Sequence, residues 1–106
     1  MFKFCFYVPV VDAEAVKQAV FGVGAGRVGD YDCCSWECEG VGQFRPGEGS
    51  HPHIGREGKV ERVAELKVEM VCASDALPSV ISALLAAHPY EEPAYQYWAI
   101  NPALSD

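Results

Sequence analysis

Residues 88–93 read His88-Pro89-Tyr90-Glu91-Glu92-Pro93 and divide the C-terminal third of the chain into two elements. Proline lacks an amide hydrogen and biases the residue before it away from helical angles, so a helix that reaches this stretch must end there. The two prolines also stiffen a backbone that presents a histidine, a phenol and two carboxylates. Such presentation suits a ligand or metal site, and it equally suits an ordinary turn.

The sequence predicts a helix before this stretch and a strand after it. Apolar residues recur at helical spacing from Leu77 to Leu85, and Ser74 or Asp75 can cap the helix. Residues 94–100 are predicted as the last strand. The aromatic residues of that strand are Tyr95, Tyr97 and Trp98.

Residues 59–72 predict a long strand upstream of the helix. The side chains expected on its buried side are Val63, Leu66, Val68 and Met70, and those expected in water are Glu65, Lys67 and Glu69. The alternation slips near Ala64, so we expect a β-bulge there.

The N-terminal half predicts a strand, a helix, a hairpin and a loop. Residues 2–9 alternate as a half-buried strand does, and the side chains expected against the core are Phe2, Phe4, Phe6 and Val8. A helix that Asp12 can cap follows to about residue 23. Residues 31–45 resemble two short strands around Glu39-Gly40, which predicts a hairpin. Residues 46–58 are rich in glycine and proline and predict a long exposed loop, which is often functional.

The element order predicts an α+β, ferredoxin-like sandwich with an extra hairpin, folded as one domain over residues 1–106. Two helices would cover one face of an antiparallel sheet and leave the other face bare. The aromatic side chains expected on the bare face are Tyr7, Trp36, Tyr95 and Tyr97. Because exposed aromatic faces usually mark interfaces, we expect a homo-oligomer, either a dimer or a trimer.

The composition argues against several classes of protein. The chain carries 8 basic and 15 acidic residues, and this balance disfavours nucleic acid and anionic membrane surfaces as partners. No apolar run approaches the roughly 20 residues that span a bilayer. The apolar N-terminus is too short for a signal peptide, so we expect a cytoplasmic protein with reduced thiols.

Two short motifs resemble ligand-binding motifs, but their sequence context does not support those functions. Gly24-Ala25-Gly26-Arg27-Val28-Gly29 matches the G-x-G-x-x-G fingerprint, but a helix precedes it and a strand follows, which reverses the dinucleotide-binding order. The cysteines Cys33, Cys34 and Cys38 lack the paired spacing of a zinc site. We interpret the glycines as a helix end and tight loop, and the cysteines as small residues of a sheet.

A metal site is the sharpest chemical hypothesis that the residues allow. His51 and His53 place two imidazoles on the stiff loop, and imidazole suits zinc or copper. If the fold brings His88 and Glu91 near them, these four residues would form the ligand set. The alternative is a solvated loop and a plain turn. No nucleophile–base arrangement or phosphate-binding loop is present in the sequence, so we expect no enzyme.

Several motifs occur in an order that resembles a known family. They are Gly24-Ala25-Gly26-x-x-Gly29-x-Tyr31-x-x-Cys34-Ser35-Trp36, Gly40-x-Gly42-x-Phe44-x-Pro46-x-x-Gly49, Pro52-x-Ile54-Gly55, Val63-x-Glu65 and Ala87-His88-Pro89-Tyr90-Glu91-Glu92-Pro93-Ala94-Tyr95. They resemble the domain inserted in the middle of bacterial YqfO-type proteins, of the NGG-interacting-factor-three-like family. The resemblance runs from about Phe4 to Ile100.

The resemblance implies a domain similar to CutA and to PII signalling proteins, whose relatives pack into trimers through their sheets. In the full-length family, the domains that flank the insert build a dinuclear metal site with residues that this chain lacks. We therefore expect the insert standing alone, without the hydrolase activity suspected for the parent family.

Three functions follow as hypotheses. The first is a small oligomeric binding or regulatory module that senses a metal ion or small anion, with Glu92 orienting one of the four ligands. The second is a protein-interaction domain without a small ligand, which docks through its aromatic sheet face. The third, with least support, is a metal-dependent hydrolase that uses Glu91.

Overall fold

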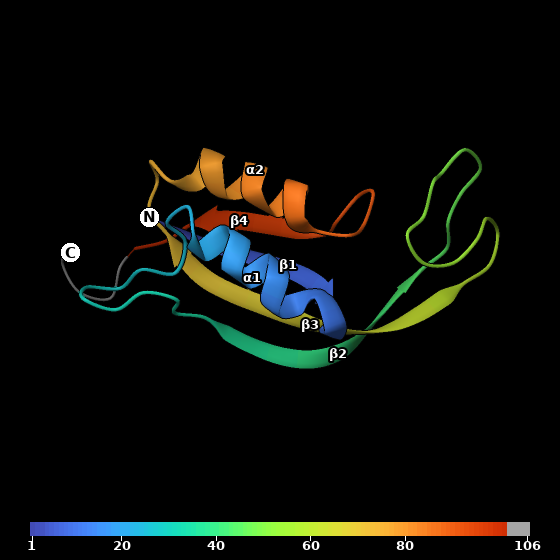
Figure 1. The fold of residues 1–106 in the computed structure, drawn as a ribbon, viewed down its shortest axis with the longest axis horizontal. Helices are drawn as coiled ribbons and strands as arrows, with labels where there is room; N and C mark the ends of the chain where they lie inside the picture. Colours follow the sequence, from blue (N-terminus) through green and yellow to red (C-terminus); the bar gives the residue numbers. More distant parts are fainter. Residues whose placement is uncertain (102–106) are drawn as a thin grey trace.

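A computed structural model describes residues 1–101, which form one four-stranded sheet with two α-helices (Figure 1). The elements are β1 (Phe2–Pro9), the 3-10 helix η1 (Val10–Asp12), α1 (Ala13–Phe21), β2 (Trp36–Phe44), β3 (Glu61–Cys72), α2 (Leu77–Ala87) and β4 (Tyr95–Ala99). The sheet order is β2-β3-β1-β4 and all neighbours are antiparallel. The predicted ferredoxin-like sandwich is confirmed.

The core lies between the sheet and the two helices. β1 occupies a central position, and its alternation places Phe4, Phe6 and Val8 against the helices, as predicted. The residues with no exposed surface are Phe4, Phe6 and Val8 from β1, Val16 and Val20 from α1, Val68 from β3, and Val80 and Leu84 from α2. Both helices therefore cover the same face of the sheet, and no described helix covers the other.

Residues 31–45 do not form the predicted hairpin. β2 runs straight through Gly40, and every residue from Trp36 to Phe44 pairs with β3. A tight Glu-Gly hairpin would need positive φ at its centre, whereas Gly40 and Gly42 are absent from the glycines with positive φ. Cys33 and Cys34 lie in the loop before β2, not in a strand.

β3 also departs from the prediction. Its register with β2 is continuous from Trp36↔Glu69 to Phe44↔Glu61, so no bulge interrupts the described strand at Ala64. Val63 shares a face with Glu65, opposite Leu66, and the assignment of Val63 to the helix-covered side was wrong. Glu65 is buried with 9% of its surface exposed, although it was expected in water.

The last strand is present, but its aromatic faces are exchanged relative to the prediction. Tyr95 pairs with Phe6 and Tyr97 with Phe4, so both tyrosines lie on the helix side. Tyr97 meets Phe2 edge-on, with ring centroids 5.8 Å apart. Trp98, opposite Lys3, lies instead on the bare face, which it shares with Tyr7 and Trp36.

The helix starts lack the side-chain caps that the sequence suggested. Asp12 precedes α1 but makes no capping hydrogen bond, and Ala76 rather than Ser74 or Asp75 precedes α2. The hydroxyl of Ser74 instead accepts a hydrogen bond from the amino terminus of Met1 at 2.9 Å. Packing of the apolar faces therefore stabilises both helices without these caps.

The glycines after α1 form the predicted helix end and tight loop. Gly24 and Gly26 have positive φ, and the Gly26 amide donates to the Val71 carbonyl at 2.8 Å. A side chain at Gly26 would collide with the Cys34 carbonyl and the Phe21 ring. The motif therefore anchors a loop on the sheet.

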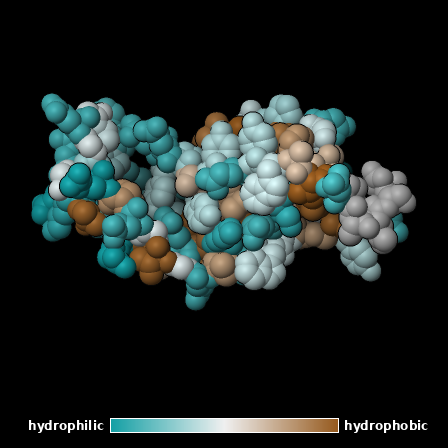
Figure 2. All heavy atoms as spheres, turned by 180° about the vertical axis from the view of Figure 1, so that it is seen from behind, coloured by the Kyte–Doolittle hydropathy of each residue, from teal (hydrophilic) through white to brown (hydrophobic). Residues whose placement is uncertain are grey.

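The molecule is elongated, measuring 49 × 24 × 22 Å. The connection between β2 and β3, which we call loop 45–60, extends with these strands beyond the helices (Figure 1). Seen from behind in Figure 2, apolar and hydrophilic side chains alternate over the surface, and the lobe of this loop is set apart by a hollow. Within residues 1–101, no helix has the length and apolar character needed to cross a membrane.

Candidate functional site

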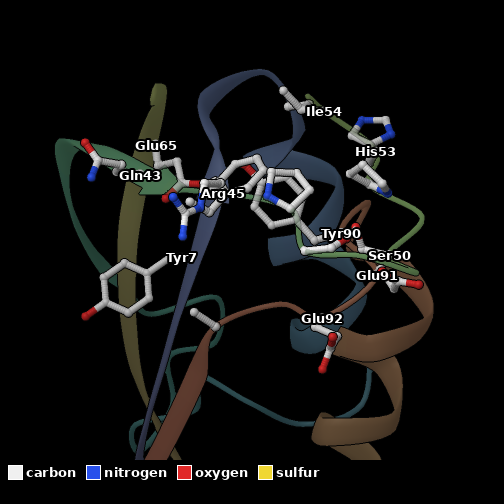
Figure 3. Close-up of a pocket in the computed structure, with 16 residues that line it drawn as sticks. Tyr7, Gln43, Arg45, Ser50, His53, Ile54, Glu65, Tyr90, Glu91 and Glu92 are labelled. Atoms are coloured by element: carbon white, nitrogen blue, oxygen red, sulfur yellow. Dashed lines mark hydrogen bonds between the residues drawn. The ribbon is translucent and has the colours of Figure 1, made fainter. Parts of the chain in front are cut away.

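A cleft of about 380 Å³ lies where loop 45–60 folds back toward the segment 88–94 (Figure 3). The sheet forms its floor through β2 and β3, and the loop and the segment form its walls. The lining residues used below are Tyr7, Gly42, Phe44, Arg45, Gly47, His53, Glu65, Tyr90, Glu91 and Glu92. The cleft therefore joins the two parts of the sequence that were predicted to meet.

Glu65 is the buried polar group of this cleft. Its carboxylate lies directly over Gly42 of the neighbouring strand, where any side chain would overlap with it. The Tyr90 hydroxyl donates to Glu65 Oε2 at 2.7 Å, a length typical of a charge-assisted hydrogen bond. Glycine on β2 thus provides the space in which a carboxylate can be buried.

The ring of Tyr90 packs against two other aromatic rings. The ring lies 5.8 Å from that of Phe44 and 5.0 Å from that of His88, measured between centroids. Burial, followed by the hydrogen bond to Glu65 and its negative charge, raises the pKa of Tyr90 well above its ordinary value. The hydroxyl therefore stays protonated and keeps donating to Glu65 at neutral pH.

His88 is a structural residue in this arrangement. Only 6% of its surface is exposed, its Nδ1 accepts from the Tyr90 amide at 3.1 Å, and its Nε2 lies 2.7 Å from the Tyr7 carbonyl. Since Nδ1 accepts, the ring proton is on Nε2, which donates to Tyr7. Burial lowers the pKa of His88 and favours this neutral ring.

Of the other predicted metal ligands, His51 and His53 lie in loop 45–60, and Glu91 lies with His88 in the segment 88–94. The His51 amide donates to Glu91 Oε1 at 3.1 Å, so the loop and residues 88–93 do meet. His53 and Glu91 line the cleft, as does Glu92, and all three side chains are exposed. Within residues 1–101 no three histidine, cysteine, aspartate or glutamate side chains form a group that could hold a metal. His88 is separated from the set by its two backbone hydrogen bonds.

The cysteines are all free, and two of them are buried. Cys5 lies on the bare side of β1, where burial raises the pKa of its thiol. Cys33 has a positive φ of 55° and is exposed. Cys38 borders a second hollow of about 230 Å³ that shares Tyr7 and Glu65 with the cleft.

Sequence reasoning overlooked Glu65 as a residue of the site, and it gave Tyr90 no role. Glu65 was assigned to water because it alternates with apolar residues of β3. Two signals were available: the slip in alternation near Ala64, and a glycine in each of two positions of β2 that face the same way. Both features belong to a strand face that buries a polar side chain.

Comparison with known proteins confirms the resemblance to NIF3-related proteins. No family model matches the chain. Proteins called "GTP cyclohydrolase 1 type 2 homolog" match over nearly its whole length. That of Mycobacterium tuberculosis is 51% identical over 100 residues, which is 94% of this chain and 26% of the relative. That of Bacillus subtilis is 39% identical over 99 residues, 93% of this chain and 26% of the relative.

Solved structures agree with the fold. The Bacillus cereus protein related to NIF3 superposes with a TM-score of 0.81 at 38% identity, over 95% of this chain and 26% of that protein. CutA1 from Pyrococcus horikoshii superposes with a TM-score of 0.71 at 18% identity, over 100% of this chain and 89% of its own. The chain thus spans about a quarter of the NIF3-related proteins that it matches, whereas CutA1 shares its fold at nearly full length.

Proposed function

We propose that the chain is a small binding or regulatory module, and that a small ligand enters the cleft beside Glu65. One observation carries the proposal: Glu65, an acidic residue with 9% of its surface exposed, lines a cleft whose walls come from two separate segments. Concave sites with a few fixed polar groups are the usual form of small-ligand sites. Loop 45–60 forms one wall, so a bound ligand would contact this loop and influence its position.

A divalent transition metal, zinc or copper, is one ligand that this module could sense. His51, His53 and Glu91 would be its ligands, and His88 would join them only by giving up its bond to either Tyr7 or Tyr90. The CutA of Archaeoglobus fulgidus bears the name "periplasmic divalent cation tolerance protein" at 19% identity, and this likeness is one of fold alone. The name motivates including metals among the probes.

The proposal is tested by a screen for small ligands that is read at the cleft. Amide chemical shifts of the isotope-labelled chain would be followed while zinc, copper, inorganic phosphate and short amines are added in turn. We expect at least one probe to shift the amides of cleft residues and to saturate.

Two tryptophan variants make this screen specific for the cleft. Gly47 lines the cleft, and no atom lies within 4 Å of a Cβ built there. A Gly47→Trp variant should therefore fold and obstruct the site, so the ligand-induced shifts should vanish. Glu48→Trp places the same side chain next to it, at a position that does not line the cleft, and should leave them intact. If no probe binds saturably to the parent chain or to the Glu48→Trp control, the proposal is disproved.

A second candidate function is supported by the bare face of the sheet. Trp36 is 61% exposed and Trp98 45% exposed, and large exposed aromatic side chains often mark contact surfaces. We propose that this face mediates self-association, as a dimer or a trimer, or docks a protein partner. The cleft opens on this same face of the sheet, at the end next to loop 45–60, because Tyr7 and Glu65 both lie on this face and line the cleft.

We propose no enzymatic activity for this chain. The name "GTP cyclohydrolase 1 type 2 homolog" belongs to proteins of which the chain matches about a quarter. Turnover of GTP or of a phosphoester by the purified chain, abolished by Glu91→Gln, would contradict this. The free state of all five cysteines supports a cytoplasmic location as part of the same proposal.

A further inference from the structure

The carboxylate of Glu65 has no cationic partner in the described part of the protein. Ion pairs in residues 1–101 occur only between Lys17 and two glutamates, so no lysine, arginine or histidine nitrogen lies within 4.0 Å of Glu65. Tyr90 donates to Oε2, while no described residue donates to Oε1. Every buried side-chain polar atom of the described residues has a hydrogen-bond partner, so Oε1 is not fully buried and stays accessible to a ligand in the cleft.

The remaining charges of the cleft favour a cation. Glu65, Glu91 and Glu92 contribute three carboxylates to its lining, against the single guanidinium of Arg45. Figure 3 shows the Arg45 and Glu65 side chains projecting into the same space, Arg45 from the start of loop 45–60 and Glu65 from β3. Excess negative charge in a concave, partly apolar site raises the local concentration of cations.

The aromatic lining favours an organic cation over a bare metal ion. The rings of Phe44 and Tyr90 lie 5.8 Å apart at a mutual angle of 58° and both line the cleft beside Glu65. Faces of aromatic rings attract ammonium groups, whereas a transition metal needs several ligand atoms at fixed short distances. The volume of about 380 Å³ accommodates a small organic molecule.

We propose that the ligand of this cleft is a small organic amine, whose ammonium group pairs with Glu65 Oε1 beside the rings of Phe44 and Tyr90. This inference rests on the function proposed above and specifies its ligand class. The ammonium donates to Oε1, the oxygen that Tyr90 leaves free. The negative charges of Glu91 and Glu92 attract any further positive charge on the ligand.

The test uses three probes of equal length and different charge. Cadaverine carries an ammonium at each end, the corresponding diol is neutral, and glutarate carries two carboxylates. Titration calorimetry of the full chain at low ionic strength should show saturable binding of cadaverine and none of the diol or glutarate. The same titration in the Gly47→Trp variant should show no binding.

Three variants assign the binding to Glu65. Glu65→Gln retains an acceptor for Tyr90 and should weaken cadaverine binding by about tenfold or more, because a bond to a charged group is lost. Glu48→Gln removes the same charge from the neighbouring loop at a position outside the cleft and should leave the affinity unchanged. Arg45→Ala removes the competing cation and should maintain or strengthen the binding.

The contrary outcomes separate this inference from the function on which it rests. Binding of glutarate or phosphate that Arg45→Ala abolishes would overturn the amine assignment and leave the binding module intact. Binding of zinc without cadaverine would do the same. Failure of every probe at the cleft would overturn both proposals. If cadaverine fails and Glu65→Gln dissociates an oligomer, the cation belongs to a second copy of the chain, and the inference is wrong.

Discussion

Among single residues, Gly42 matters to the cleft as much as the carboxylate that lies over it. A methyl group at this position would overlap with the Glu65 carboxylate, whereas a methyl at Gly40, two residues earlier on the same face, meets nothing within 4 Å. We predict that Gly42→Ala lowers the free energy of unfolding by about 1–3 kcal/mol, because Glu65 must leave its place.

Gly40→Ala is the matched control for this prediction. It should change the free energy of unfolding by no more than about 0.5 kcal/mol. Urea denaturation of both variants decides the matter. Equal losses in the two variants would mean that the cost arises from the strand and not from Glu65.

The hydrogen bond between Tyr90 and Glu65 gives a second prediction. Tyr90→Phe removes the described donor to the carboxylate of Glu65, a residue with 9% of its surface exposed, and we expect it to cost about 1–3 kcal/mol. In a Glu65→Gln background the cost of Tyr90→Phe should be smaller, because the loss of the Tyr90 hydroxyl destabilises a neutral amide less than it destabilises a carboxylate. A double-mutant cycle measures the coupling, and Tyr31→Phe, at a residue 76% exposed, serves as the control. Additive effects in the cycle would argue against the bond.

His88 makes the stability depend on pH. Burial lowers its pKa in the folded state below the ordinary value of 6.5, so the unfolded chain takes up a proton at higher pH than the folded chain does. The contribution of His88 is therefore complete above about pH 6.5 and is lost as the pH falls below it. One proton gives a slope of at most about 1.4 kcal/mol per pH unit.

Urea denaturation between pH 8 and about pH 5 measures this slope, since 6.5 is the ordinary value from which the pKa is lowered. His88→Gln should remove it, and His51→Gln, at an exposed ring, should retain it. An unchanged slope in the His88 variant would show that other groups cause the dependence.

The candidate site could be predicted from the sequence only in outline. The stretch 88–93 and the histidine loop were expected to meet, and the His51 amide does bond to Glu91. The direction of a side chain was beyond local reasoning: His88 turns inward because the Tyr7 carbonyl, 81 positions away, lies within reach of its ring. Glu65 likewise depends on a glycine of another strand. Long-range partners, which no sequence window contains, decide both.

Among the secondary-structure elements, the sequence identified most strands and both helices but missed which faces and turns they use. Glu39-Gly40 resembled a hairpin because glycine is frequent in turns, but here glycine serves the packing of Glu65 across the sheet. Tyr95 and Tyr97 were placed on the wrong face because alternation gives the period of a strand and not its phase. The phase is set by the pairing of β4 with β1.

Loop 45–60 is predicted to be separable from the fold. The helices pack on the sheet away from this loop, so a two-residue Asn-Gly turn between Phe44 and Glu61 should keep the core (Figure 1). We expect the free energy of unfolding to change by less than about 2 kcal/mol, because loop length costs little entropy. The amide spectrum of the core should persist, while ligand binding at the cleft disappears.

A glycine–serine linker of the original length is the control for the shortened loop. It should also fold and also lose binding, because it lacks the side chains and prolines of the wall. Loss of the core spectrum in the shortened chain would show that the loop is needed for folding. Retained binding in either chain would place the ligand elsewhere.

For the whole molecule, the ferredoxin-like sandwich leaves one broad surface without a covering layer. This surface is mixed in character: Trp36 and Trp98 lie exposed on the same face as Lys3, Lys67 and Glu69. Figure 2 shows brown and teal side chains interspersed over the side of the molecule seen from behind. A contact through such a face would therefore combine aromatic anchors with charged pairs, as protein interfaces do.

We accordingly predict that the tryptophans of this face hold an oligomer together. The wild-type chain should sediment as a dimer or trimer, and the double variant Trp36→Glu, Trp98→Glu as a monomer, because association would desolvate two unpaired carboxylates. Val11→Glu, at a residue 93% exposed on η1 and outside the sheet, should leave the oligomer intact. Sedimentation velocity over a range of concentrations measures all three chains. A wild-type chain that remains monomeric throughout would refute the self-association and leave the docking of a different protein as the use of this face. An oligomer that survives the double variant must instead form through another surface. The free edge of β2 is the first such surface to examine.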